Sequence, residues 1–258
     1  MRIIHGSENE TMRDGVVAVL KKASKQKSLK VLDAGGGLNS WLGEYVTHII
    51  DINPTCSDEN IEIIQGDINE AKTWEQIKDN YFDFVSSTHT LEDIRDPKFV
   101  VKQFSRVART GYIAVPNRRS EFQAVESQNY LGYAHHRWIF HLRERNKLEA
   151  VAKWIGISNE NVLLDHFLGS GKKLFKSKLS TLLPAELKPT KTNFLELGLV
   201  WEVGLDLEYL NSDFAGASGA IMKTNALKFL ADPFVNFELS HKWEDDLYEA
   251  IVQELKSS

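Results

Sequence analysis

Three acidic residues lie at or just after the ends of three apolar segments, and a turn of three glycines follows the first. Asp51 lies sixteen residues after Gly35, and Asp67 lies sixteen residues after Asp51. Asp33 precedes Gly35 and Gly37 in the segment VLDAGGG, Asp51 ends the next apolar segment, and Asp67 follows the third. Glycine lets the backbone turn sharply and come close to a ligand. A carboxylate in the second position can accept both hydroxyls of an adenosine ribose, and one in the third can accept an adenine amino group. The pattern therefore predicts a nucleoside-binding site.

The charge of Asp33 indicates which nucleoside this is. A carboxylate two residues before the first glycine repels a pyrophosphate but suits a ligand that carries an ammonium group and a sulfonium. Ser40 also replaces the third glycine of the dinucleotide pattern. We therefore expect S-adenosylmethionine and not NAD. An NAD-dependent oxidoreductase is the alternative, because Asp51 would hold the ribose of NAD equally well.

Short apolar segments alternate with helical patterns in the first half of the chain, and they would position these acids. Strands are expected at 29–34, 47–50, 61–64, 82–86 and 111–115, and helices at 8–26, at 40–46 and from Pro97 onward. The alternation predicts an α/β fold, a Rossmann-like, doubly wound and mostly parallel sheet with helices on both faces. In such a sheet, ligands bind at the carboxyl ends of the strands.

The second half of the chain is less regular. We expect a helix at 146–156, a hairpin or paired strands at 195–210, a lysine-rich loop that includes 172–178, and a C-terminal helix marked by Leu247, Ile251 and Leu255. We interpret 1–258 as a single domain. Residues 1–116 would form the cofactor-binding core, and residues 117–258 would complete the sheet and cover the substrate side of the site.

Four segments of the first half, VLDAGGG, IIDIN, GDI and FDFVSSTHTLEDIRDP, together resemble the motifs of class I S-adenosylmethionine-dependent methyltransferases. The resemblance covers about 1–116, and the motifs occur in the family's order. It implies that Asp33, Gly35 and Gly37 line the methionine side, that Asp51 holds the ribose, that Asp67 and Ile68 meet the adenine, and that Ser87 and His89 lie beside the sulfonium. Ile52 is a further candidate for cofactor binding. Asp93 departs from the family's HxLEHxxDP pattern, which has histidine there.

A second resemblance concerns the acceptor. The segments GYIAVPNRRSE and AHHRWIF are similar to those of bacterial methyltransferases of polysaccharide and other cell-surface glycan synthesis. This implies methyl transfer to an oxygen of a sugar, a glycan or a related small molecule. A methyltransferase-like binding module without turnover is the remaining alternative, because of the departure at Asp93 and the irregular second half.

Methyl transfer from a sulfonium is an in-line displacement, so the enzyme mainly supplies alignment and exclusion of water. A base near the methyl group would help a hydroxyl acceptor, and the candidates are His89, His135, His136 and His141, with Glu92 behind them. Adjacent residues of a strand point to opposite faces, so at most one of His135 and His136 is expected in the site. Neither a carboxylate nor a cysteine at a matching spacing accompanies these histidines or His141, and no metal is expected. A structural hydrogen bond is the alternative role for each.

Arginines are the candidates for binding a charged acceptor. Arg118, Arg119 and Arg137 could hold a carboxylate or phosphate, because guanidinium groups bind these anions at two points. Solvated surface charge is the alternative for all three.

Composition sets limits on partners and location. The 258 residues include 31 Lys and Arg against 36 Asp and Glu, so the net charge of −5 predicts no nucleic-acid partner. A single cysteine, Cys56, cannot form an internal disulfide. No apolar run is long enough to span a bilayer, and the segment MRIIHGSENE lacks the apolar core of a signal peptide. We therefore expect a cytoplasmic protein.

Overall fold

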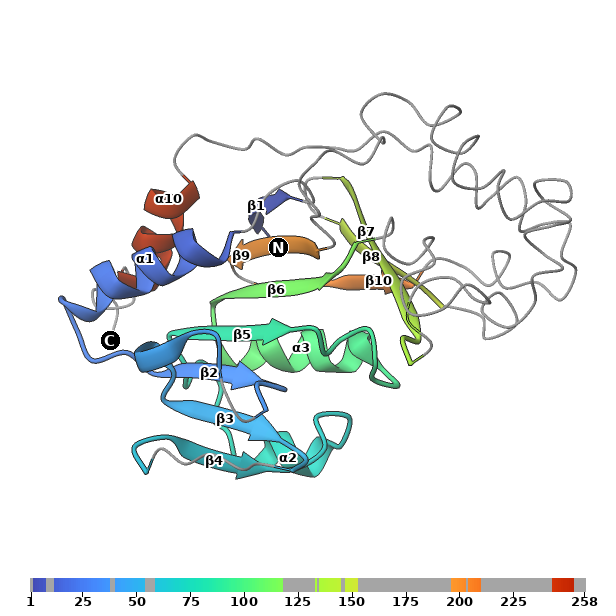
Figure 1. The fold of residues 1–258 in the computed structure, drawn as a ribbon, viewed down its shortest axis with the longest axis horizontal. Helices are drawn as coiled ribbons and strands as arrows, with labels where there is room; N and C mark the ends of the chain where they lie inside the picture. Colours follow the sequence, from blue (N-terminus) through green and yellow to red (C-terminus); the bar gives the residue numbers. More distant parts are fainter. Residues whose placement is uncertain are drawn as a thin grey trace, which may run out of the picture.

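The computed structural model describes residues 2–7, 12–37, 40–53, 59–117, 133, 135–144, 147–152, 196–202, 204–209 and 243–252. The strands are β1 (Arg2–Ser7), β2 (Val31–Ala34), β3 (His48–Asp51), β4 (Glu62–Gln65), β5 (Phe84–Thr88), β6 (Thr110–Pro116), β7 (Trp138–Glu144), β8 (Lys147–Ala152), β9 (Glu196–Glu202) and β10 (Leu207–Tyr209). The helices are α1 (Arg13–Ser24), α2 (Ala71–Glu75), α3 (Pro97–Val107) and α10 (Trp243–Val252), with one turn of 3-10 helix at Gly43–Tyr45. Figure 1 shows their arrangement.

Seven strands form the central sheet, in the order β1-β9-β6-β5-β2-β3-β4. The five strands from β4 to β6 pair in parallel, and β9 is antiparallel to both β6 and β1. This confirms the predicted doubly wound, mostly parallel α/β sheet. The strand order reverses between β2 and β5, because the chain builds outward from β2 to β3 and β4 and then crosses to β5. Open sheets of this kind bind ligands at the carboxyl ends beside that reversal.

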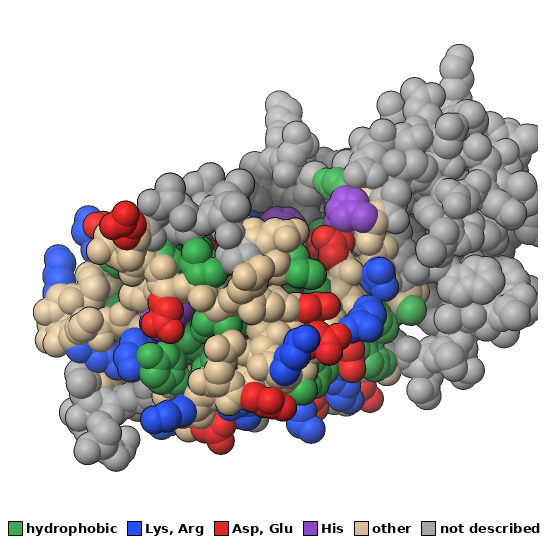
Figure 2. Space-filling view, turned by 90° about the horizontal axis from the view of Figure 1, so that it is seen from below, with side chains coloured by type: hydrophobic (Ala, Val, Ile, Leu, Met, Phe, Trp, Pro, Cys, Tyr) green, Lys and Arg blue, Asp and Glu red, His purple; other side chains and the backbone are tan. Residues whose placement is uncertain are grey.

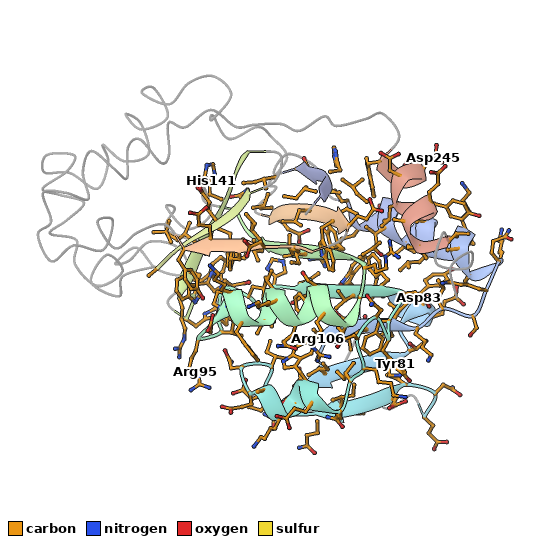
Figure 3. The ribbon with its side chains drawn as sticks, turned by 180° about the vertical axis from the view of Figure 1, so that it is seen from behind. Tyr81, Asp83, Arg95, Arg106, His141 and Asp245 are labelled. Carbon is orange, nitrogen blue, oxygen red and sulfur yellow. The ribbon has the colours of Figure 1, made fainter. Side chains whose placement is uncertain are left out.

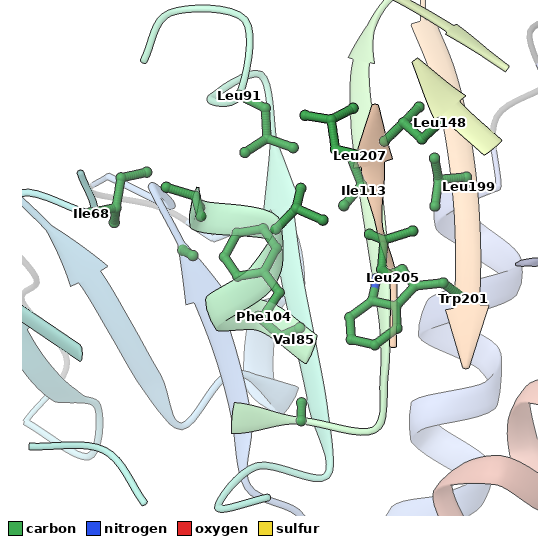
Figure 4. Packing of buried hydrophobic residues seen from close by; sticks show 14 of the residues in the cluster. Ile68, Val85, Leu91, Phe104, Ile113, Leu148, Leu199, Trp201, Leu205 and Leu207 are labelled. Atoms are coloured by element: carbon green, nitrogen blue, oxygen red, sulfur yellow. The ribbon is translucent and has the colours of Figure 1, made fainter. Parts of the chain in front are cut away.

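Both faces of the central strands are covered by helices. Val31 and Phe84 pack in a hydrophobic cluster with residues of α1 and α10, whereas Leu32 and Val85 pack in a second cluster with residues of α3. Figure 4 shows Val85 of the sheet and Phe104 of α3 together in the second cluster. Burial on both faces explains why these strands read as continuous apolar runs in the sequence.

The helix expected at Pro97 is present, and its start follows from local chemistry. The Asp96 side chain accepts a hydrogen bond from the Phe99 N–H at 3.0 Å, and Pro97 occupies the first turn. At the far end of α3, Arg106 donates to the carbonyl oxygens of Trp74 and Ile77, at 2.9 and 2.8 Å (Figure 3). The helix is therefore fixed against both the sheet and the segment of α2.

The helix expected at 146–156 is wrong for the part that the structure describes, because Lys147–Ala152 is strand β8. This strand pairs antiparallel with β7 and parallel with β10 in a separate three-stranded sheet. Leu148 and Ala150 are fully buried, and Glu149 between them is 2% exposed. Pairing on both edges outweighs the modest helix preference of Lys, Leu, Glu and Ala.

The segment 195–210 does contain two strands, but they do not form a hairpin. β9 lies in the central sheet between β6 and β1, and β10 lies in the small sheet beside β8. Strand β1 was not expected, and it supplies the edge of the central sheet from the start of the sequence. The C-terminal helix is present as α10, with Leu247 and Ile251 buried, whereas Leu255 lies outside the described residues.

The charged surface is mixed. Lys, Arg, Asp and Glu side chains are interspersed over the described part of the face that Figure 2 shows. Within the described ranges, no helix is both long and apolar enough to cross a membrane.

Candidate active site

The three predicted acids come to one edge of the sheet, because β2, β3 and β4 run parallel and in register. Asp51 at the end of β3 pairs with Gln65 at the end of β4, and Asp67 follows two residues later. Asp33 lies one residue inside β2 and is 1% exposed, whereas Asp51 and Asp67 are partly exposed. This edge is the carboxyl edge beside the reversal of strand order, where the fold binds ligands.

The glycine turn needs glycine for two different reasons. Gly35 and Gly37 have φ angles of +82° and +57°, in the left-handed region that other residues rarely adopt. At Gly36 the reason is close approach, because a Cβ atom there would collide with the Asp33 carboxylate. The turn is joined to β3 by the Gly35 N–H, which donates to the carbonyl oxygen of Ile50 at 2.8 Å. A backbone held this close to the strand ends leaves room for a ligand above them.

Asp51 and Asp67 are both held in place by neighbouring N–H groups. Asp51 accepts from the Gly37 N–H at 3.2 Å through Oδ2 and from the Asn53 N–H at 2.8 Å through Oδ1. Asp67 Oδ1 accepts from the backbone and the side chain of Asn69, both at 2.8 Å. A carboxylate has about four acceptor positions, so each acid keeps capacity for a ligand hydroxyl or amino group.

Ile52 and Ile68 differ in exposure. The side chain of Ile52, directly after Asp51, is 59% exposed, which is unusual for a large apolar residue in this protein. Ile68 is 7% exposed and belongs to the cluster beneath the sheet, and the Trp74 indole donates to its carbonyl oxygen at 2.8 Å. Ile52 is therefore the residue of this pair that offers an open apolar surface to a flat ring.

Asp33 is a buried carboxyl whose protonation is poised near neutral pH. Burial raises the pKa of Asp33 to about 6, against the opposing effects of the Ser40 and Ser86 hydroxyls and the charge of Arg13. Neither of its oxygens accepts a hydrogen bond of ordinary geometry from the described residues. Such a group favours a cationic ligand next to it, which would restore the charged form.

Ser87 and His89 continue from β5, on the other side of the reversal. Ser87 is buried, and its hydroxyl donates to the carbonyl oxygen of Ala34 at 3.0 Å, so it joins β5 to the end of β2. His89 follows the strand with a φ of +50°, and its N–H donates to the Ala114 carbonyl oxygen at 2.9 Å. This backbone turn presents the imidazole at the carboxyl edge.

Glu196, the first residue of β9, is the centre of an ionic network around that imidazole. His89 Nε2 lies 3.1 Å from Glu196 Oε2, and Arg13 Nη2 donates to the same oxygen at 2.5 Å. Tyr112 donates to Glu196 Oε1 at 2.9 Å. The second ring nitrogen of His89 lies 3.4 Å from Oε1 of Glu92, a residue that is 1% exposed. Two carboxylates thus flank one imidazole.

The network shifts the pKa values of both partners in the direction of an ion pair. The neighbouring Glu196 and Glu92 carboxylates raise the pKa of His89 to about 9, against the opposing effect of burial. Burial by itself would raise the pKa of Glu196, but His89, Arg13 and Tyr112 outweigh it and lower that pKa to about 2. His89 is therefore a cation and Glu196 an anion at neutral pH.

His135 and His136 lie together beside Asp93, contrary to the expectation that they face opposite ways. They lie in the turn before β7 and not in a strand, so the alternation of strand side chains does not apply. Nε2 of His135 is 4.0 Å from Oδ1 of Asp93, and the two imidazole rings are 4.5 Å apart at their centroids. His141 is placed elsewhere, in β7 and in register with Glu149 of β8.

The predicted arginines are only partly covered. Arg137 is exposed, and its backbone N–H donates to the carbonyl oxygen of Glu92. Arg118, Arg119 and the lysine-rich segment 172–178 lie outside the described residues.

A family of methyltransferase domains matches residues 6–158, which is more than half of the chain and includes every acid and glycine of this edge. The chain belongs to this family. Its central sheet has the class I methyltransferase fold, whose enzymes use S-adenosylmethionine as the methyl donor. Among curated proteins, no sequence match was found.

Solved methyltransferase structures resemble parts of the chain. One is an arsenic(III) S-adenosylmethionine methyltransferase from Chlamydomonas reinhardtii, with 19% identity and a TM-score of 0.30 over 40% of this chain and 49% of that one. Another is magnesium protoporphyrin IX methyltransferase from Synechocystis PCC 6803 with bound S-adenosylmethionine, with 18% identity and a TM-score of 0.33 over 42% of this chain and 59% of that one. The match covers less than two thirds of either protein.

The residues of the methyltransferase fit its cofactor in charge and in space. Asp33 is a buried carboxylate without an ordinary hydrogen-bond donor, which suits the ammonium and sulfonium of S-adenosylmethionine. The turn at Gly36 has no room for a side chain. Asp51 has acceptor capacity for ribose hydroxyls at the expected place in the sheet.

We expect the ion pairs of His89 with Glu196 and Glu92 to stabilise the folded methyltransferase at neutral pH. This stabilisation should be lost at high pH. The folded pKa of about 9 is above the ordinary value of about 6.5. The stabilisation is therefore complete below about pH 6.5 and disappears as the pH rises through about 9. Urea unfolding of the wild type and of His89→Gln from pH 6 to pH 10 would measure this. A stability difference between the two proteins that stays constant over the range would contradict it.

The sequence gives no sign that Glu196, Arg13 and Tyr112 form a network with His89. Glu196 is 107 residues from His89 and 183 residues from Arg13, so no spacing in the sequence connects them. Tyr112 was assigned only to a strand, and its hydroxyl is fixed by a strand that pairs antiparallel with its own. The only signal was an acidic residue at the start of an apolar segment, LELGLVWEVG, which many surface strands share.

Proposed function

We propose that this protein transfers the methyl group of S-adenosylmethionine to an oxygen of a sugar, a glycan or a related small molecule in the cytoplasm. The observation that carries the proposal is the convergence of Asp33, Asp51 and Asp67 on one edge, beside a glycine turn with two left-handed residues. The glycan acceptor is supported by the resemblance of GYIAVPNRRSE and AHHRWIF to methyltransferases of cell-surface glycan synthesis.

Each residue of this edge has a role in the proposal. Asp33, Gly35 and Gly37 would line the methionine side, Asp51 would hold the ribose, and Asp67 would meet the adenine with Ile52 and Ile68 nearby. The exposure of Ile52 supports contact with the flat adenine ring. His89 follows β5 toward the sulfonium, whereas the buried hydroxyl of Ser87 supports a role in fixing β5 and not the direct contact with the sulfonium that the resemblance implies. S-adenosylmethionine supplies an already activated methyl group, so the chain has to align the acceptor and exclude water.

The protonation of His89 changes the role that we propose for it. A cationic imidazole between two carboxylates has no free lone pair with which to remove a proton. It can instead orient the acceptor or donate a hydrogen bond to an anionic group on it. His135 and His136 are then the candidates for a general base, and Arg137 is the described candidate for contact with a charged acceptor.

Thermal unfolding in the presence of four ligands tests the cofactor directly. S-adenosylmethionine or S-adenosylhomocysteine at about 100 times its dissociation constant should add about 2.7 kcal/mol. For a chain of this size that corresponds to a rise in Tm of about 5–10 °C. NAD and NADH should have no effect. A rise in Tm with NAD alone would replace the proposal by a redox function. No change in Tm with any of the four ligands would favour a binding module without turnover.

A further inference from the structure

Asp93, His135 and His136 form a group of metal-ligating side chains apart from the acids assigned to the nucleoside. One ligand atom from each lies within 4.8 Å of the others. Among the described residues, no other group of three or more His, Cys, Asp or Glu side chains has its ligand atoms this close together. Two imidazoles and one carboxylate are a set that proteins use for divalent transition metals.

The two segments that carry this group are fixed to one another by three hydrogen bonds. The N–H groups of Arg137 and Trp138 donate to the carbonyl oxygen of Glu92, at 2.6 and 3.2 Å. The Trp138 indole donates to the carbonyl oxygen of Ile94 at 2.8 Å. Glu92 and Ile94, on either side of Asp93, are therefore hydrogen-bonded to Arg137 and Trp138, which follow His136. These bonds fix the two segments that carry the three side chains.

Packing restricts one of the two imidazoles further. His136 is 8% exposed, and its ring packs on that of Tyr133 with centroids 4.5 Å apart. The side chains of His135 and Asp93 are 59% and 40% exposed. One ligand is thus buried while two reach the surface, and the exposed side would leave coordination positions for water or for an oxygen of another molecule.

We propose that Asp93, His135 and His136 bind one divalent first-row transition metal ion, of which Zn²⁺ is the representative. Tetrahedral Zn²⁺ at about 2.0–2.1 Å from each ligand places ligand atoms about 3.3 Å apart. His135 Nε2 lies 4.0 Å from Asp93 Oδ1, and the three ligand atoms lie within 4.8 Å of one another, so they would have to approach by up to about 1.5 Å when the ion binds. A bound metal ion would take up the ring lone pairs of His135 and His136, so metal binding and a general-base role for these two histidines exclude one another. The metal site does not depend on the proposed acceptor or on the cofactor.

The test is a titration of the full-length, tag-free protein, freed of metal with a chelator, by Zn²⁺ in a calorimeter and by Co²⁺ in an absorption spectrometer. The wild type should bind one equivalent, and Co²⁺ should show the d–d bands of a low-coordinate site with nitrogen ligands. Asp93→Asn, His135→Ala and His136→Ala should each weaken Zn²⁺ binding at least about tenfold and remove those bands. Asp245→Asn, on α10 and paired with Lys22, is the matched control and should bind as the wild type does.

Two results would overturn the site. One is stoichiometric binding that survives all three substitutions, which would place the ion elsewhere. The other is no binding by the wild type up to about 100 μM Zn²⁺. His136 is buried, so circular dichroism checks that each variant folds, and the exposed Asp93 and His135 keep the test valid if His136→Ala does not fold.

Discussion

Asp51→Ala should weaken the binding of S-adenosylmethionine and S-adenosylhomocysteine at least about 100-fold. The carboxylate is proposed to accept both ribose hydroxyls, and hydrogen bonds to a charged group contribute about 1.5–3 kcal/mol each. Two of them amount to about 3 kcal/mol or more, and 1.4 kcal/mol is a factor of ten in the dissociation constant. Titration calorimetry with S-adenosylhomocysteine measures the change without any knowledge of the acceptor.

Asp51 also accepts hydrogen bonds from the N–H groups of Gly37 and Asn53, so Asp51→Ala could weaken cofactor binding by disturbing the local backbone. Two further variants distinguish this effect from the loss of the ribose contact. Asp51→Asn keeps one acceptor oxygen, which can serve the Asn53 N–H or the Gly37 N–H but not both, so this variant should fold with a modest loss of stability and still bind the cofactor poorly. Asp79→Ala removes a 72% exposed carboxylate that pairs with Arg106 and should leave cofactor affinity unchanged. Unchanged affinity in Asp51→Ala would refute the nucleoside site.

Glu196→Gln should lower the free energy of unfolding by about 1–3 kcal/mol and return the pKa of His89 toward its ordinary value. The substitution leaves the guanidinium of Arg13, 29% exposed, and the imidazole of His89 without the charge that they share. Breaking a fully buried ion pair costs about 3–5 kcal/mol, and exposure to solvent reduces that figure here. Urea unfolding measures the stability, and the imidazole resonances of His89 in an NMR pH titration measure its pKa.

The matched control is Glu62→Gln, because Glu62 also pairs with a histidine. Oε2 of Glu62 lies 3.2 Å from Nε2 of His48, but the Glu62 side chain is 68% exposed. Exposed pairs contribute about 0–1 kcal/mol, so this variant should unfold close to the wild type. If the two variants lose equal amounts of unfolding free energy, the Glu196 network is no more stabilising than an exposed pair. If the pKa of His89 does not change in Glu196→Gln, Glu92 alone sets that pKa.

Several elements could be predicted because their signals are local. The strands β2 and β3, which carry Asp33 and Asp51, are short apolar runs because both of their faces are buried. The edge strand β4 before Asp67 is mostly exposed, and its signal is the pair of isoleucines at its centre. The glycine turn could be predicted for the same reason, since the left-handed angles of Gly35 and Gly37 are a requirement of the local backbone. These elements place the predicted nucleoside site without any distant contact.

Other elements depend on partners that are far away in the sequence. Residues 147–152 carry helix-forming side chains, but pairing with β7 and β10 makes them a strand. Asp93 is 42 residues from His135, and the hydrogen bonds of residues 137 and 138 to Glu92 and Ile94 bring them together. A search for ligand spacing along the chain does not find such a group.

The fold class, the family and the edge where the nucleoside is expected can thus be read from the order of the residues alone. The charge states at that edge and the groups that surround its histidines depend on the folded arrangement of the chain. The physical reason is that periodicity and turn chemistry act between near neighbours, whereas the pKa of His89 depends on a carboxylate that β9 delivers from 107 residues away. A charge is set by what surrounds it in space, and strand pairing decides those surroundings.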